Sequence, residues 1–262
     1  LILIWDKWQI HNGKQPTFFP ASFVNEQAQQ APAAKAADGS LPSATTATAP
    51  AGSTPSEAPA PVAQRHVVRT DVFELVFNSE GGALVGATLL KHASGELGTP
   101  PFVLLDQSER RTYVAQTGLI GAAGTELPTH KTPMRLVSGE PVLADGQDRL
   151  TLRFESAPVN GVVLAKTYTL QRGAYDIAVR HEVINQGAAA IEPQLYLQLV
   201  RDGSIAGSAT PFYSTFTGPV VYSSTAKYQK VEFSDLDKGK ATFEKTAADG
   251  YVAMVQHYFA TA

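Results

Sequence analysis

The stretch that decides the fold is residues 162–185, VVLAKTYTLQRGAYDIAVRHEVIN. In its first half Val162, Leu164, Tyr168 and Leu170 fall on one face at a period of two, and Lys166 interrupts this apolar face. The alternation resumes after the turn at 171–174, where Tyr175, Ile177, Val179 and Val183 share one face. Period-two alternation on both sides of a glycine-containing turn predicts an antiparallel hairpin with one buried face.

The same pattern continues on both sides of this hairpin. Beyond residue 187, the apolar residues Ile191, Leu195, Leu197 and Leu199 alternate with polar ones, which predicts a third strand completing a three-stranded meander. The run 251–259 is apolar on both sides, as a central strand covered by two layers would be. No segment after residue 65 shows a sustained helical period. Many short strands separated by Gly and Pro turns predict an all-β fold, a large antiparallel β-sandwich.

Composition narrows the classes of protein that fit. A net charge of -3 gives no electrostatic reason to expect nucleic-acid binding. The chain has no cysteine, so disulfides and thiolate metal sites are excluded. The hydrophobic fraction of 44% is enough for a substantial core, but it is unevenly distributed along the chain.

The first 12 residues are apolar at their start and carry two tryptophans. The run from Leu1 to Trp5 is far shorter than the roughly 20 residues needed to cross a bilayer. Trp5 and Trp8 lie beside Asp6 and Lys7, a pattern typical of a helix that leaves the hydrocarbon for the headgroup region. Residues 1–12 therefore suit the end of a transmembrane anchor with Trp5 and Trp8 at the membrane interface, or alternatively a soluble amphipathic N-terminus.

Residues 13–65 are expected to form a flexible tether. The part from 26 to 64 consists almost entirely of Ala, Pro, Ser, Thr, Gln and Gly, which cannot bury enough apolar surface to offset the entropy of ordering. A mucin-like stalk is disfavoured because serine and threonine do not dominate. The structured domain is predicted to occupy residues 66–262.

The sequence offers no recognisable catalytic or metal-binding motif. It lacks a glycine-rich phosphate loop, a GxSxG elbow and an HExxH helix. His181 and Glu182 are neighbours that could suggest acid–base chemistry, but adjacent strand residues point to opposite faces of a sheet. His257 and Tyr258 are likewise read as ordinary strand residues. The aspartates of 145–148 and 235–237 lack the ligand spacing of a calcium loop. We therefore predict no catalytic residue, no metal site and no cofactor.

Four segments carry a family resemblance that covers essentially the whole chain. They are LILIWDKWQIHNG at 1–13, FELVFNSEGGALVGATLLKH at 73–92, KTYTLQRGAYDIAVRHEVIN at 166–185 and GYVAMVQHYFATA at 250–262. In this order, and with the low-complexity tether between the first two, the chain resembles the YidC membrane-protein insertases of Gram-negative bacteria.

The resemblance implies a transmembrane helix, a tether and a periplasmic β-super-sandwich that is similar to galactose-mutarotase-like folds. It implies a non-enzymatic insertase and chaperone of the inner membrane, with residues after about 12 in the periplasm. The implied partners are nascent membrane proteins, the Sec translocon and its accessory component SecDF, and the lipid bilayer through the N-terminal helix. It also implies a domain that continues past Ala262, so that the 251–262 strand would be left with an open, apolar edge.

Two other classes of function remain open at this point. A carbohydrate-binding or aldose-epimerase-like protein would need a histidine and a carboxylate that converge in one cleft, and the sequence offers no obvious pair. An exported binding module on a lipid or helical anchor would need no such pair. Five further apolar spans downstream would identify the insertase.

Overall fold

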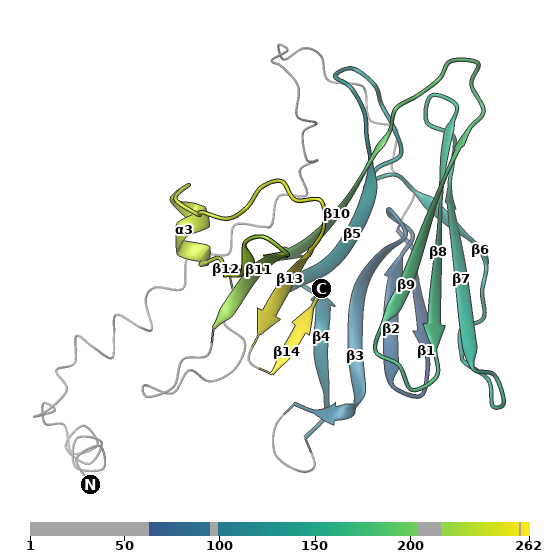
Figure 1. Ribbon diagram of the computed structural model, residues 1–262. Coiled ribbons are helices and arrows are strands. Elements are labelled where there is room, and N and C mark those ends of the chain that lie inside the picture. Colours follow the sequence, from purple (N-terminus) through teal and green to yellow (C-terminus); the bar gives the residue numbers. More distant parts are fainter. Residues whose placement is uncertain (1–62, 95–98, 204–215, 257) are drawn as a thin grey trace, which may run out of the picture. The chain divides into compact units, whose positions relative to one another are not determined.

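The computed structural model describes residues 63–94, 99–203, 216–256 and 258–262 (Figure 1). The predicted anchor residues Trp5 and Trp8 and almost all of the predicted tether lie outside the described residues. The described strands form three antiparallel sheets, and the one helix among the described residues is short. The predicted all-β antiparallel class is confirmed.

The largest sheet has six strands in the order β1-β2-β3-β4-β5-β10. Its strands are β1 (Arg65–Arg69), β2 (Phe73–Asn78), β3 (Ala83–Ala93), β4 (Pro101–Gln107), β5 (Thr112–Ile120) and β10 (Gln194–Arg201). The alternation along β2 buries Phe73, Leu75 and Phe77 and leaves the residues between them partly exposed, as period two requires. The sheet therefore has one strongly apolar face.

The second sheet contains the hairpin that the sequence predicts. It has four strands in the order β6 (Met134–Ser138), β7 (Arg149–Ser156), β8 (Val162–Gln171) and β9 (Ile177–Asn185). Strands β8 and β9 pair in antiparallel register from Val162 opposite Asn185 to Leu170 opposite Ile177. The hairpin prediction is confirmed.

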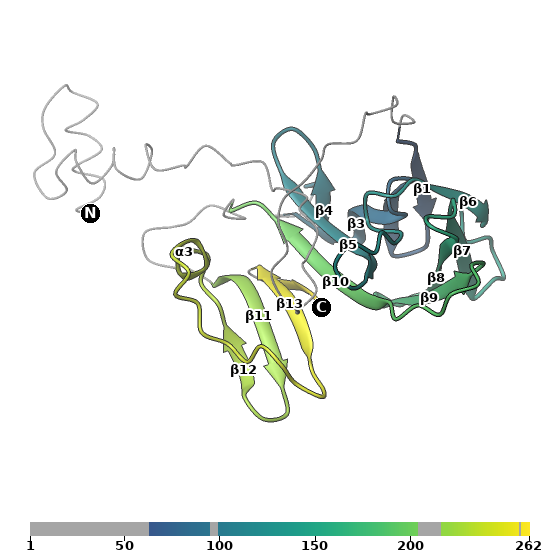
Figure 2. The same ribbon diagram turned by 90° about the horizontal axis from the view of Figure 1, so that it is seen from above.

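The predicted three-stranded meander is wrong. Strand β10 pairs with β5, with Leu199 opposite Ala115, so it belongs to the six-stranded sheet and not beside β9. The segment between β9 and β10 carries the chain from one layer to the other (Figure 2). Alternation tells which side chains share a face, but it does not tell which strand lies alongside, and this is why the sequence pattern misled.

The third sheet is formed by the C-terminal part of the chain. Its four strands are ordered β12 (Lys227–Lys230), β11 (Thr217–Ser223), β13 (Tyr251–Gln256) and β14 (Phe259–Thr261). The short helix α3 (Phe233–Asp237) precedes β13 in the chain. The run 251–259, predicted as one strand, is two strands of a hairpin in which Gln256 faces Phe259. Val252, at the start of this run, is 52% exposed in this chain, and the covering of both faces in a longer domain stays a prediction.

The core lies between the six-stranded sheet and the β6–β9 sheet. The first sheet contributes Leu75, Phe77 and Tyr113, and the second contributes residues such as Leu164 and Phe154, all in one buried cluster. The ring of Phe77 is 4.8 Å from that of Tyr168 across the interface between the sheets. Full burial of one such side chain contributes roughly 1.5–3 kcal/mol. This packing makes the two sheets the layers of a sandwich.

Backbone hydrogen bonds join the two layers along one side, and a groove lies between them along the other. On the β1 and β6 side, backbone hydrogen bonds link them: Arg69 N–H donates to the Pro141 carbonyl (2.8 Å), and Met134 N–H to that of Ser79 (2.7 Å). On the opposite side, β9 and β10 are the last strands of their respective sheets in the described part of the chain. The sandwich therefore has a closed side and an open side.

Candidate functional site

A groove of about 520 Å³ lies on the open side of the sandwich. Strands of both layers line it, with Ile177 and Val179 on β9 and Leu197 and Leu199 on β10. Its walls are mainly apolar, and Asp176 carries the one acidic side chain among the described residues that line it. The groove therefore suits apolar or neutral polar groups better than ions.

Lys166 lies fully buried between the layers, next to this groove. Strand alternation turns it inward from the centre of β8, where its exposed fraction is 0%. Its Nζ donates to the carbonyl oxygens of Gly81 and Thr117, each at 2.6 Å, and both carbonyls belong to the opposite layer. Burial lowers the pKa of Lys166 from 10.5 to about 7 because the charged form loses its hydration.

His181 faces the same interior region as Lys166, its direct partner across β8 and β9. Its Nε2 is hydrogen bonded to Oγ1 of Thr117 at 2.8 Å. Burial, together with the charge on Lys166, lowers the pKa of His181 to about 4. The imidazole is therefore neutral at pH 7 and helps to fix Thr117, which lines the groove.

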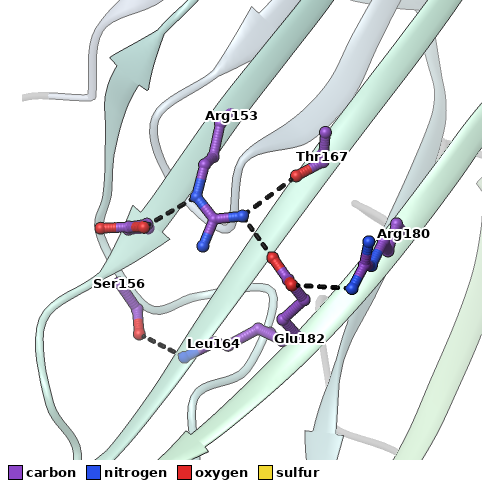
Figure 3. Close-up of polar contacts among 7 residues, drawn as sticks. Arg153, Ser156, Leu164, Thr167, Arg180 and Glu182 are labelled. Atoms are coloured by element: carbon purple, nitrogen blue, oxygen red, sulfur yellow. Dashed lines mark hydrogen bonds and ion pairs between the residues drawn. The ribbon is translucent and has the colours of Figure 1, made fainter.

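Glu182 lies on the opposite, outer face of the sheet and binds arginines (Figure 3). Arg153 donates to it and also to Glu155, the latter at 2.8 Å, while Arg180 pairs with Glu182 at 3.0 Å. The hydrogen bond from Arg153 is the main reason that the pKa of Glu182 is lowered. His181 and Glu182 therefore have separate sets of contacts on opposite faces of the sheet, as the strand geometry predicts.

The turn between β2 and β3 receives hydrogen bonds from two side chains of β8. The hydroxyl of Tyr168 donates to the Gly82 carbonyl at 2.6 Å, beside the bond from Lys166 to Gly81. Both glycines have positive φ, and a Cβ on Gly81 would come within 2.2 Å of the His130 carbonyl oxygen. Only glycine fits this turn, because an L side chain would be strained and would collide with backbone. The two glycines therefore allow a tight turn whose carbonyls accept hydrogen bonds from Lys166 and Tyr168.

The sequence reasoning missed Lys166, Tyr168 and Thr117 as a buried polar cluster. The available signal was the lysine on an otherwise apolar strand face, since lysine is almost never fully buried without partners. Its partners could not be found from the sequence because the Gly81 carbonyl lies 85 positions away in the chain.

The remaining candidates from the sequence do not gather into a site. No group of three or more metal-ligating side chains occurs among the described residues, and both aspartate clusters fall within this part of the chain. His257 lies outside the described residues, and Tyr258 is 84% exposed. Within the described ranges, no helix is long and apolar enough to cross a membrane.

Comparison with known proteins matches the sandwich to a family. The family model described as the YidC periplasmic domain matches residues 65–262, which include all of the described strands. The chain belongs to the YidC periplasmic domain family. The resemblance inferred from four sequence segments is confirmed.

Three relatives, all named membrane protein insertase YidC, extend this YidC match over the whole chain. The Bordetella pertussis protein is 46% identical over 275 residues, the Bordetella avium protein 47% over 273, and the Cupriavidus metallidurans protein 40% over 265. Each match covers 100% of this chain but only 46–47% of the relative. The chain thus spans about half the length of the YidC proteins that it matches.

Proposed function

We propose that this chain is the periplasmic region of a membrane-protein insertase and chaperone, which helps inner-membrane proteins to insert and fold, alone or with the Sec translocon. The observation that carries the proposal is the family match over residues 65–262, extended by relatives that are named insertases. Insertion itself is assigned to a protein of the relatives' length, since this chain spans less than half of it.

The same proposal assigns the parts of the chain to compartments. Residues 1–12, with Trp5 and Trp8 at the membrane interface, form the end of the anchor, and residues 13–65 form the tether. Residues after about 12 lie in the periplasm, where the 66–262 domain contacts SecDF and nascent membrane proteins. Support comes from the order of segments in the sequence and from the interfacial preference of tryptophan.

We further propose that the domain has no catalytic activity. Acid–base chemistry on a sugar needs a positioned acid and base within reach of one substrate. His181 is bonded to Thr117 inside the sandwich, whereas Glu182 is bonded to arginines on the outer face. An aldose mutarotation assay on the 262-residue chain should show no turnover above buffer. Turnover that His181→Ala abolishes would restore the carbohydrate-enzyme alternative.

Co-purification tests the proposed partnership with SecDF. The matched segment of the Bordetella pertussis insertase would be replaced by this chain, and the tagged chimera purified from detergent-solubilised inner membranes. We expect SecD and SecF to be enriched with the chimera but not with a version that lacks the segment. Equal recovery with both proteins would contradict a contact through this domain.

A further inference from the structure

Among the described residues, the surroundings of Lys166 offer hydrogen-bond acceptors but no opposite charge, which is unusual for a buried amine. Its Nζ donates hydrogen bonds to the backbone carbonyls of Gly81 and Thr117. Within its own sheet, Lys166 lies directly opposite Phe154 on β7 and His181 on β9. The other titratable groups that pack around this region are His130, beside the Gly81 turn, with its partner Tyr196 on β10, and Tyr168 on β8. All of these are neutral or basic.

The number of acceptors matches the neutral form of the amine. A neutral amine has two N–H groups, and the two carbonyls accept one each, whereas an ammonium has a third N–H and a full charge. A desolvated charge without a counter-charge is strongly disfavoured in a protein interior. Local opening of the two layers would let water solvate the ammonium group. Thr117 and Tyr168 line the groove, so water can reach the amine from the groove when the layers open there.

We propose that Lys166 is a pH-dependent clamp, which ties the two layers together beside the groove as a neutral amine and lets them open locally when it is protonated. The clamp acts on three segments: β8, β5 through Thr117, and the β2–β3 turn through Gly81. The bond from Tyr168 to Gly82 does not depend on this proton and holds the same turn at the next carbonyl.

The sign of the pH effect follows from linkage. The pKa of Lys166 is about 7 in the closed state and 10.5 for a solvated lysine. Between these values the open state binds the extra proton, so closure is favoured at high pH and weakens as the pH falls to 7. The opening constant should rise about 50-fold from pH 9 to pH 7 and only about twofold more from pH 7 to pH 5.

Hydrogen exchange of the 262-residue chain tests the clamp. Protection factors would be measured by mass spectrometry at pH 5, 7 and 9 for peptides that span β5 and β8, after correction for intrinsic exchange rates. We expect the 50-fold loss of protection from pH 9 to pH 7 in the wild type and in His181→Asn. Lys166→Met, which keeps the length of the side chain, should show protection that does not vary with pH. A flat profile in the wild type, or an unchanged profile in Lys166→Met, would overturn the proposal.

A direct titration keeps the test valid if Lys166→Met does not fold. Lysine labelled with carbon-13 at Cε reports the protonation of each lysine by NMR in the wild-type chain. The clamp requires one lysine resonance that titrates near pH 7, in contrast to the exposed lysines. If every lysine of the folded protein titrates near 10, the amine is charged at neutral pH and the clamp does not exist.

Discussion

The hydrogen bond from Tyr168 to the Gly82 carbonyl offers a measurable test of how the layers are held together. Tyr168→Phe removes one oxygen atom and leaves the ring against Phe77, so packing is conserved. The hydroxyl is buried, which raises the pKa of Tyr168, so the group is protonated and donates at neutral pH. Without it, the buried carbonyl of Gly82 loses its donor.

The expected cost can be worked out from this geometry. A buried acceptor left without a partner costs about 1–3 kcal/mol, more than the net value of an average hydrogen bond. For a domain of about 200 residues this corresponds to a fall in Tm of roughly 2–12 °C. Tyr175→Phe is the matched control, since the hydroxyl of Tyr175 makes no hydrogen bond within the part of the chain that the structure describes and its side chain is 43% exposed. That variant should change the free energy of unfolding by less than about 0.5 kcal/mol.

Urea denaturation followed by circular dichroism would give the free energy of unfolding for each variant at pH 7. We expect a clear loss of unfolding free energy for Tyr168→Phe and almost none for Tyr175→Phe. If both variants unfold at the wild-type urea concentration, the Gly82 carbonyl has another donor or is solvated. In that case the Tyr168 hydroxyl does not hold the β2–β3 turn.

Three further predictions concern the turns, the open edge and the outer face. Gly81→Ala should destabilise the chain much more than Gly173→Ala in urea denaturation: both glycines have positive φ, but only at Gly81 does a Cβ collide with backbone. The exposed β10 edge should promote self-association, and Leu197→Lys should weaken it in sedimentation velocity, because Leu197 is 64% exposed on this edge strand. Arg153→Gln should lower the urea midpoint more than Arg180→Gln, since Arg153 bonds two carboxylates and Arg180 is 77% exposed.

Local patterns in the sequence are sufficient to predict the central hairpin and the fold class. The alternation around residues 171–174 predicts strands β8 and β9 because it reports which side chains must be buried, and the turn keeps the two strands adjacent. The position of β10 could not be predicted in this way, since its partner β5 is more than 70 residues earlier and any pleated strand shows the same alternation. Adjacency in the chain was therefore mistaken for adjacency in the sheet.

The candidate site shows the same division between local and long-range information. In the sequence Lys166 is only an interruption of an apolar face, whereas in the structure it is one of the residues that join the two layers. Its partners are backbone carbonyls of two distant segments. Every residue has a backbone carbonyl, so the sequence does not show which of them lie near Lys166. The opposite faces of His181 and Glu182 were predictable because strand geometry alone determines them.

The central claim, that this chain is a periplasmic domain of an inner-membrane protein, can be tested by labelling from one side of the membrane. The chain has no cysteine, so Thr225→Cys, in the exposed turn between β11 and β12, would introduce a single one. This variant would replace the matched segment of an otherwise cysteine-free Bordetella pertussis insertase, and spheroplasts would be treated with a membrane-impermeant maleimide. For a periplasmic domain we expect labelling in intact spheroplasts to the same extent as in lysed ones. Labelling that appears only after lysis would contradict it.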